Sequence, residues 1–317
     1  LADKNSNSWN FAESVQKYIK TEKEINISLE EVHIGHFRNG EQDMHVPENM
    51  RQKEIYFIHD STKNPAEWWV ELLLLKDLLK SSSAHKVSFV LPNILYARQD
   101  RKHKSHVPIS IRAFIKSISP GLERIITLDL HSQQIQGMFP EDVPIDSMDS
   151  FPVVVRYLKE NLGDIKDLRD LVIVSPDVGG AKRARDLARR LESKYPIAII
   201  DKDRLKPGEV KIENMALIGD VKNKDVLVPD DIYDSCGTSC CAGELLKRKG
   251  ARRKWTYASH GLFTKGTEEI GKCYDRVMVS NTHYIKDKHV EVIDFAPLFG
   301  EVIYRAQKGL SISKLFK

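Results

Sequence analysis

Two adjacent carboxylates, Asp230 and Asp231, are followed by a turn of small residues. Like charges side by side repel, so the pair indicates a diol, a metal ion or a basic partner beside it. The turn can expose backbone N–H groups to an anion, and a helix expected from about Ser239 adds its positive N-terminal end. These features favour a ribose 5-phosphate site over an ordinary capped connection. The turn residues are Asp234, Ser235, Cys236, Gly237 and Thr238.

Three other polar stretches could also meet phosphate groups. The loop Tyr96–Lys102 contains Arg98, whose guanidinium suits bidentate phosphate binding. The glycine turn Ser175–Gly180 precedes a basic helix and lets the backbone approach an anion closely. Lys202 and Arg204 open a long polar loop, where two cations could neutralise charge in a transition state. The alternative in each case is a solvated loop or a simple turn.

A candidate metal site centres on His131, which follows a predicted strand. A lone histidine is usually structural, but carboxylates come soon after it in the chain and another is available from the second half. One histidine with carboxylates and waters can hold a Mg²⁺ ion that is mainly coordinated by phosphates. The carboxylates are Asp142, Asp146 and Asp177.

The composition is that of an ordinary soluble globular chain, with 317 residues, 41% hydrophobic and 30% charged. A formal net charge of +4 gives no case for nucleic acid or an anionic membrane as partner. Glu71 interrupts the longest apolar run, and the first residues do not resemble a signal peptide, so we expect no membrane span. The four cysteines form no C-x-x-C pair, which indicates free thiols in a reducing cytoplasm rather than a zinc site.

Strands alternate with helices along the whole chain, which predicts an α/β fold with parallel sheets covered on both faces. The pattern restarts near residue 151, so two halves are expected, roughly 1–150 and 151–300. Ligands of such sheets bind beyond the carboxyl ends of strands, near a switch in strand order. The polar loops named above all follow predicted strands, so they can converge on one cleft.

Apolar periodicity gives the expected elements. Helices are predicted over residues 8–20, 66–80, 108–119, 151–160, 181–193, 239–249 and 297–307. Strands are predicted over residues 29–34, 55–59, 87–91, 125–130, 171–174, 197–200, 226–228, 254–258 and 277–279.

The order and spacing of these stretches resemble the ribose-phosphate pyrophosphokinase family, the phosphoribosyl pyrophosphate (PRPP) synthetases, over nearly the whole chain. The markers are the loop Phe37–Glu41 and the sequences Y-A-R-Q-D-R-K, D-L-H-S-Q-Q-I-Q-G, S-P-D-V-G-G and D-D-I-Y-D-S-C-G-T. The resemblance implies two phosphoribosyltransferase-like domains, each a mainly parallel sheet flanked by helices. Residues 1–150, joined by the C-terminal tail 305–317, would serve ATP and oligomer contacts, and residues 151–304 would bind ribose 5-phosphate.

The resemblance also implies a reaction, in which ATP donates its β,γ-pyrophosphoryl group to the C1 hydroxyl of ribose 5-phosphate to give PRPP and AMP. It implies Mg²⁺ as cofactor and a homo-oligomer built from dimers, such as a hexamer. The implied ATP-binding residues are Arg98, Gln99 and Asp100, with Phe37, Asn39 and Glu41 from a neighbouring subunit. The implied metal ligands are His131 and Asp177, with Asp129, Asp142 and Asp146 as further carboxylates. Asp230 and Asp231 would take the ribose hydroxyls, Asp234–Thr238 the phosphate, and Lys202 and Arg204 would close over the migrating group.

Several positions depart from the family pattern. Pro229 stands before the acidic pair where relatives often have valine, and it removes one N–H from the strand ladder. The loop after Arg204 is about two residues longer than usual, and Pro140-Glu141 resembles a small insertion that leaves the register of Asp142 open. Arg51, Ser311 and Ser313 match the family's regulatory phosphate site.

Two alternatives to PRPP synthesis remain open. The acceptor could be a larger ribose 5-phosphate derivative such as ADP-ribose, which Pro229 and the longer loop motivate. The chain could instead be a non-catalytic regulatory paralogue, although the presence of Lys202, Arg204, His131 and Asp177 argues against it. A simple phosphoribosyltransferase would share the turn at 234–238 but not the R-Q-D loop or the second domain.

Overall fold

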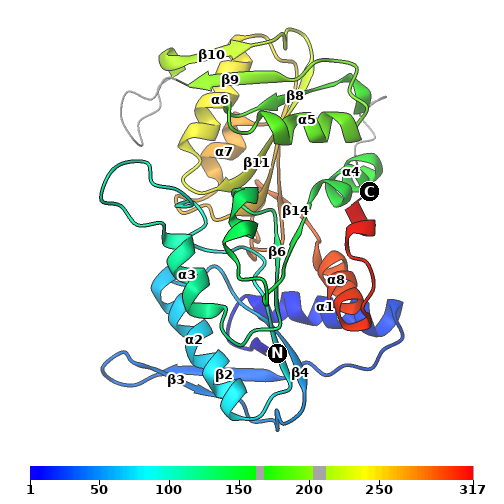
Figure 1. Cartoon of the computed structure of the whole chain (residues 1–317). Helices are drawn as coiled ribbons and strands as arrows, with labels where there is room; N and C mark the ends of the chain where they lie inside the picture. The colour runs from blue at the N-terminus through cyan, green and yellow to red at the C-terminus, as the bar shows by residue number, and fades with distance from the viewer. Residues whose placement is uncertain (162–167, 203–211, 317) are drawn as a thin grey trace. The chain divides into compact units, whose positions relative to one another are not determined.

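The computed structural model describes residues 1–161, 168–202 and 212–316, and it divides the chain into two compact units. Unit 1 consists of Leu1–Asp149, Thr282–Tyr284 and Phe295–Lys317, and unit 2 of Ser150–Asn281 and Ile285–Asp294. Each unit is a mainly parallel sheet flanked by helices, as the alternation of elements predicts (Figure 1). No helix in the described part of the chain is long and apolar enough to cross a membrane.

The described residues of unit 1 form a seven-stranded sheet in the order β3-β2-β1-β4-β5-β6-β7. Its neighbours pair in parallel, except that β3 runs antiparallel to β2. The strands are β1 (Ala2–Asp3), β2 (Glu31–His36), β3 (Gln42–His45), β4 (Glu54–Ile58), β5 (Lys86–Val90), β6 (Arg124–Leu128) and β7 (Ile145–Met148). The helices are α1 (Ser8–Glu22), α2 (Pro65–Ser81), α3 (Ser110–Ile118) and α8 (Ala296–Lys308).

Unit 2 repeats this arrangement, with a seven-stranded sheet among its described residues in the order β10-β9-β8-β11-β12-β13-β14. Here β10 is antiparallel to β9 and the other pairs are parallel. The strands are β8 (Leu171–Ser175), β9 (Ala198–Lys202), β10 (Met215–Ile218), β11 (Asp225–Tyr233), β12 (Lys254–Gly261), β13 (Arg276–Ser280) and β14 (Glu291–Ile293). The helices are α4 (Phe151–Asn161), α5 (Ala181–Arg190), α6 (Gly237–Arg248) and α7 (Glu268–Cys273).

Helix α8 belongs to unit 1, which corrects the predicted boundary that placed residues up to 304 in the second domain. The reason is its packing on α1. The rings of Phe11 and Phe299 meet edge to face with centroids 5.1 Å apart, and a Cβ at Gly300 would lie 2.6 Å from the Tyr18 ring. Glu301 accepts a hydrogen bond from Tyr18 Oη at 3.0 Å, so polar and apolar contacts join the two helices.

The strand order reverses at one place in each sheet, between β1 and β4 in unit 1 and between β8 and β11 in unit 2. At such a switch point the loops that follow the two central strands run to opposite sides of the sheet, which leaves a crevice between them. In unit 2 these are the loops after β8 and β11, which contain the predicted anion-binding turns. The topology therefore brings both turns to one edge of one sheet.

In unit 1 a buried ion-pair network joins the end of β1, the segment after β4 and helix α2. The Lys63 ammonium donates to Asp3 Oδ2 at 2.8 Å and to both oxygens of Glu71 at 3.0 and 2.9 Å. Both carboxylates are buried, with exposed fractions of 4% for Asp3 and 2% for Glu71. Helix α2 is also capped internally, because Asn64 Oδ1 accepts the N–H of Ala66 and Pro65 has no N–H to offer.

Asp225, at the start of β11, makes a buried ion pair that should stabilise unit 2. Arg252 donates to both of its oxygens at 2.7 and 2.6 Å, and Arg253 adds a third hydrogen bond at 2.8 Å. Burial alone would raise the pKa of Asp225, but the hydrogen bonds from the two arginines outweigh it and lower the pKa to about 2. The ionised carboxylate is therefore favoured in the folded chain.

We expect Asp225→Asn to lower the free energy of unfolding by about 1–2 kcal/mol at pH 7, with allowance for solvent around Arg252. Because the folded pKa is depressed, this contribution is fully present above the ordinary value near 3.8 and is lost as the pH falls towards 2. Urea unfolding at pH 7 and pH 3 measures the difference. The exposed pair Glu244–Arg248 provides the control, since Glu244→Gln should change stability by less than about 0.5 kcal/mol. A pH-independent loss at Asp225 would contradict the assignment.

Candidate functional site

The predicted phosphate turn lies between β11 and α6, and no side chain caps the start of that helix. Helix α6 begins at Gly237, two residues earlier than predicted, because Cys236 adopts a left-handed conformation with φ 60°. The first helical bond runs from the N–H of Cys240 to the carbonyl of Cys236 at 2.8 Å. The N–H groups of residues 237–239 therefore have no partner within the helix, and no side chain caps its start. This differs from α2 in unit 1, which its own Asn64 caps.

Neighbouring elements hold the turn in place. Thr264 donates its N–H to the Asp234 carbonyl at 3.1 Å and its hydroxyl to Asp234 Oδ1 at 2.6 Å. Tyr274 Oη donates to the Ser239 carbonyl at 2.9 Å. A Cβ at Gly243 would lie only 2.9 Å from the Cys273 carbonyl, so α6 sits directly on the end of α7. These contacts fix the helix start whose N–H groups would receive the phosphate.

The acidic pair lies inside β11, which corrects the prediction of a strand that ends at residue 228. Asp230 pairs in register with Ala258, and the ladder with β12 continues to Tyr233. The pairing with β8 covers only residues 225–227, so the missing N–H of Pro229 falls beyond that ladder. The sequence departure at Pro229 is thus accommodated in a regular strand.

The pair also has the basic partner that adjacent carboxylates require. Arg183 NH1 lies 3.3 Å from Asp231 Oδ1, and the Asp231 N–H donates to Asp230 Oδ1 at 2.8 Å. Burial, followed by the charge of Asp231, raises the pKa of Asp230 to about 8. The two carboxyl groups therefore hold about one proton between them near neutral pH.

The turn after β8 is shaped by Asp177. Its Oδ1 accepts the N–H of Gly180 at 2.8 Å, and its carbonyl accepts the Ser175 hydroxyl at 2.6 Å. A Cβ at Gly180 would lie 3.0 Å from Ser175 Oγ, so the turn is tight at this glycine. Asp177 thus has a structural role as the acceptor that orders the turn, whatever its second oxygen binds.

Of the two predicted catalytic cations, Lys202 lies within the described residues. Lys202 is the last residue of β9, where it pairs in register with Met215 of β10, and its side chain is half-buried. Its charge is felt at Cys241 on α6, whose pKa is raised mainly by burial and lowered in part by Lys202. Arg204 lies outside the described residues.

In unit 1, three predicted ATP-binding residues occupy the tip of the β2–β3 hairpin. Phe37 donates its N–H to the Glu41 carbonyl at 2.7 Å, and Asn39 Oδ1 accepts the Glu41 N–H at 3.2 Å. All three side chains are exposed, and the Phe37 side chain is 57% exposed although it is a large apolar group. The tip thus offers an aromatic face and polar groups to a partner outside the hairpin.

The other predicted ATP-binding residues follow β5. Tyr96 takes a left-handed conformation with φ 66°, and its ring packs edge to face on Trp69 with centroids 5.1 Å apart. Gln99 accepts a hydrogen bond from the Ser110 hydroxyl at the start of α3. Arg98 is exposed and Asp100 half-buried. The loop is therefore anchored at its aromatic end and through Gln99.

The predicted metal ligands of unit 1 do not form one cluster. His131 is exposed just beyond β6, and Asp129 before it has a strained φ of 38°. Asp142 is exposed, whereas Asp146 Oδ2 accepts a hydrogen bond from Arg124 NH1 at 2.7 Å. Among the described residues, no three histidine, cysteine or acidic side chains are grouped to hold a metal ion. Asp146 would have to leave Arg124 before it could bind one.

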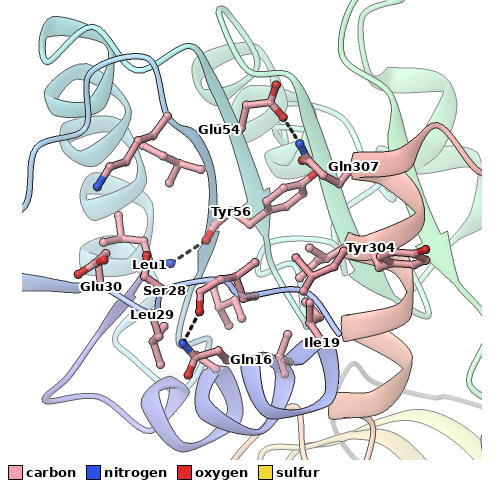
Figure 2. A pocket seen from close by; sticks show the side chains of 18 of the residues that line it. Leu1, Gln16, Ile19, Ser28, Leu29, Glu30, Glu54, Tyr56, Tyr304 and Gln307 are labelled. Carbon is pink, nitrogen blue, oxygen red and sulfur yellow. Dashed lines mark hydrogen bonds between the residues drawn. The ribbon is translucent and has the colours of Figure 1, made fainter. Parts of the chain in front are cut away.

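One cavity of unit 1, of about 360 Å³, is lined by none of the predicted site residues. Figure 2 shows its mainly aliphatic lining between α1, β4 and α8, with the Leu1 amino group donating to the Tyr56 carbonyl at 3.0 Å. Gln16 donates to the Ile27 carbonyl at 2.9 Å within it. The lining includes none of the predicted phosphate-binding residues.

Sequence reasoning missed two kinds of residue in the unit 2 site. Arg183 belongs to the basic helix predicted after the glycine turn, and nothing in the sequence shows its contact with Asp231. Thr264 and Tyr274 brace the turn from later elements, and their neighbours carry no anion-binding pattern. These contacts join elements that are far apart in the sequence, so only the three-dimensional structure reveals them.

Comparisons with known proteins match two successive domains. The N-terminal domain of ribose phosphate pyrophosphokinase matches residues 4–120, and the phosphoribosyl transferase domain matches residues 146–296. Ribose-phosphate pyrophosphokinase from Thermosipho africanus is 39% identical over 306 residues, which cover 94% of this chain and 93% of that protein. The protein of the same name from Cereibacter sphaeroides is 36% identical over 316 residues, 96% of this chain and 91% of that protein.

A solved structure shares the fold over nearly the full length. The crystal structure of phosphoribosylpyrophosphate synthetase from Mycobacterium smegmatis matches with a TM-score of 0.84 and 30% identity, covering 95% of this chain and 96% of that chain. Fold and loops together define a protein with two phosphoribosyltransferase-like domains. The chain belongs to the ribose-phosphate pyrophosphokinase family.

Proposed function

We propose that the chain is an ATP-dependent ribose-phosphate pyrophosphokinase that transfers the β,γ-pyrophosphoryl group of ATP to the C1 hydroxyl of ribose 5-phosphate, giving PRPP and AMP. The observation that carries the proposal is the β11–α6 connection. It joins a carboxylate pair with a basic partner to an uncapped helix start. Carboxylates accept hydrogen bonds from sugar hydroxyls, and the N–H groups and dipole of a helix start bind a phosphate.

ATP binding is assigned to the polar residues of unit 1. Arg98, Gln99 and Asp100 follow β5, and the guanidinium of Arg98 is exposed as a phosphate-binding group requires. Phe37, Asn39 and Glu41 sit three strands away, because β1 and β4 separate β2 from β5. At a strand spacing of about 4.8 Å this is roughly 14 Å. We assign the hairpin tip to the nucleotide of a second copy of the chain, which supports a homo-oligomer built from dimers.

Mg²⁺ is the proposed cofactor, and the small number of available protein ligands is compatible with it. Mg²⁺ keeps several waters and takes few protein ligands when phosphates coordinate it. The exposed His131 of unit 1 and the second oxygen of Asp177 in unit 2 are each proposed as one such ligand, and the described residues do not form a cage of side chains. Asp129 and Asp142 remain further candidates, and Asp146 is the least suitable because Arg124 holds it. Bound Mg²⁺ would neutralise phosphate charge.

Lys202 and Arg204 are assigned to the migrating pyrophosphoryl group. Pyrophosphoryl transfer asks for positioning and charge stabilisation more than for a covalent intermediate. Lys202 stands where β9 ends and the loop begins, so the cation is carried by a strand rather than by the loop alone. The proposed setting of the reaction is the cytoplasm, where ATP is abundant and the free thiols stay reduced.

An acceptor assay tests the proposal. Purified chain is incubated with ATP and Mg²⁺ together with ribose 5-phosphate, ADP-ribose or ribose, and AMP release is measured. We expect AMP with ribose 5-phosphate and at least about 100-fold less with unphosphorylated ribose, which cannot use the N–H groups of the helix start. AMP with ADP-ribose but not with ribose 5-phosphate would assign the larger acceptor. No AMP with any acceptor would instead favour a non-catalytic paralogue.

A further inference from the structure

We propose that Arg183 is a positioning residue of the sugar site, which holds Asp231 ionised and oriented for the sugar hydroxyls. The inference rests on the function proposed above and adds to it a residue from another element. Arg183 lies on α5, whereas the acidic pair lies on β11. The contact from NH1 to Asp231 Oδ1 is 3.3 Å, and the side chains are 25% and 12% exposed.

Arg183 lies at a helix position that is unfavourable for a cation, and its contact with Asp231 compensates for this. Arg183 is in the first turn of α5, where the helix dipole disfavours a positive charge. Lys182 and Arg185 are exposed, so water screens them. Arg183 is half-buried, and a cation with less solvent around it needs an anion. Its contact with Asp231 meets that need at the crevice between β8 and β11.

Asp231 has a matching need for a cation. Only 8% of the residue is exposed, and its neighbour Asp230 carries a second carboxyl group. The raised pKa of Asp230 shows how strongly burial and the neighbouring charge oppose a second ionisation. The contact with Arg183 favours the charged form of Asp231.

Three ionisable groups whose charges interact with Asp230 do not supply a positive charge. Burial raises the pKa of Tyr233, Cys236 and Tyr274, so these groups are neutral near pH 7. His260 of β12 is the register partner of Ile232, on the strand next to the pair. Arg183 also acts on Asp230, where its charge lowers the pKa against the effects of burial and Asp231.

Removing the guanidinium should therefore change both the strength and the pH dependence of sugar binding. Without a cation, the pKa of Asp231 rises and the pair retains its proton to higher pH. An ionised carboxylate accepts stronger hydrogen bonds from sugar hydroxyls than a protonated one. Binding of ribose 5-phosphate to an Arg183→Gln variant should thus weaken at neutral pH and recover in part as the pH rises.

Calorimetric titration of ribose 5-phosphate at pH 6 to 9, together with KM and kcat, tests the proposal. We expect Arg183→Gln to weaken binding about 10- to 100-fold at pH 7 and by less at pH 9, with kcat and the KM for ATP changed far less. Arg183→Lys keeps the charge and should recover most of the affinity. The matched control is Arg185→Gln, which removes an exposed cation two residues later and should stay within about twofold.

Three results would overturn the proposal. Arg183→Gln could bind ribose 5-phosphate with the affinity and pH profile of the unsubstituted chain. Arg185→Gln could show the same loss, which would make the effect one of overall helix charge. Arg183→Gln and Arg183→Lys could both lose affinity equally at every pH together with a lower Tm, which would make the role structural. If the unsubstituted chain binds no ribose 5-phosphate, the proposed function itself fails, and the proposal for Arg183 fails with it.

Discussion

Lys202→Ala should lower kcat for PRPP formation about 10²- to 10³-fold and leave the affinity for ribose 5-phosphate nearly unchanged. A loss of this size is typical when one preorganised group that stabilises transition-state charge is removed. Lys202 ends β9, whereas the predicted sugar-phosphate turn lies between β11 and α6, so ground-state binding of the acceptor should not need it. Steady-state kinetics gives kcat, and calorimetry without ATP gives the affinity for the acceptor.

The control for Lys202 is Lys222→Ala, which removes an exposed lysine of the same unit outside the proposed site. It should keep kcat within about twofold, because a solvated surface charge contributes little. Full PRPP synthesis by Lys202→Ala would show that the assignment of this lysine is wrong. A rise in the Kd for ribose 5-phosphate without a fall in kcat would move Lys202 from charge stabilisation to acceptor binding.

Lys63→Met should destabilise unit 1 by about 3–5 kcal/mol, the usual cost of leaving buried charges without their partner. The ammonium contacts Asp3 and Glu71, which are almost fully buried, and methionine retains the length of the side chain while it removes the charge. Urea unfolding followed by tryptophan fluorescence measures the effect. Three of the four tryptophans, Trp9, Trp68 and Trp69, are in unit 1, so the signal mainly reports on that unit.

Two variants make the Lys63 prediction specific. Lys17→Met changes an exposed lysine of α1 and should shift the free energy of unfolding by less than about 0.5 kcal/mol. Lys63→Met combined with Glu71→Gln should be more stable than the sum of the single changes implies, because one uncompensated charge is removed. A loss below about 1 kcal/mol for Lys63→Met would show that the network is more solvated than the contacts indicate.

The elements with strong apolar periodicity could be predicted from the sequence. Most helices and inner strands were predicted to within a few residues, but α7 was not predicted, and β11 continues to Tyr233, beyond its predicted end at residue 228. Five strands of the described residues were not predicted. Four of them, β3, β7, β10 and β14, are the outer strands of the two sheets, and the fifth, β1, has only two residues. An outer strand is short and has little apolar sequence, as Gln42–His45 and Glu291–Ile293 show, so its pairing depends on a neighbour that the sequence does not name.

Candidate site residues that are consecutive in the chain could be proposed from the sequence. Contacts between site residues of different elements could not. The turn at 234–238 could be found because small residues and carboxylates adjoin in the chain. Its helix start was placed two residues late, because a left-handed Cys236 is not recognisable from residue type. The partner of Asp231 comes from α5, about 48 residues earlier, and long-range pairs of this kind leave no local pattern.

The left-handed conformation of Cys236 limits which residues the turn can accept. A φ of 60° favours glycine and tolerates asparagine, whereas β-branched side chains would be strained there. The Cys236 residue is only 7% exposed, so a replacement must also be small or apolar. Burial raises the pKa of this thiol to about 12, which disfavours the nucleophilic thiolate at neutral pH.

The repeated strand order gives each unit a switch point at the same topological position, but the helix starts beside the two switch points differ. In unit 1 Asn64 caps the helix that follows β4, and Lys63 joins carboxylates of β1 and α2. In unit 2 no side chain caps the helix that follows β11. Under the proposed function we therefore expect a binding stoichiometry of one sugar phosphate per chain, although the fold is duplicated.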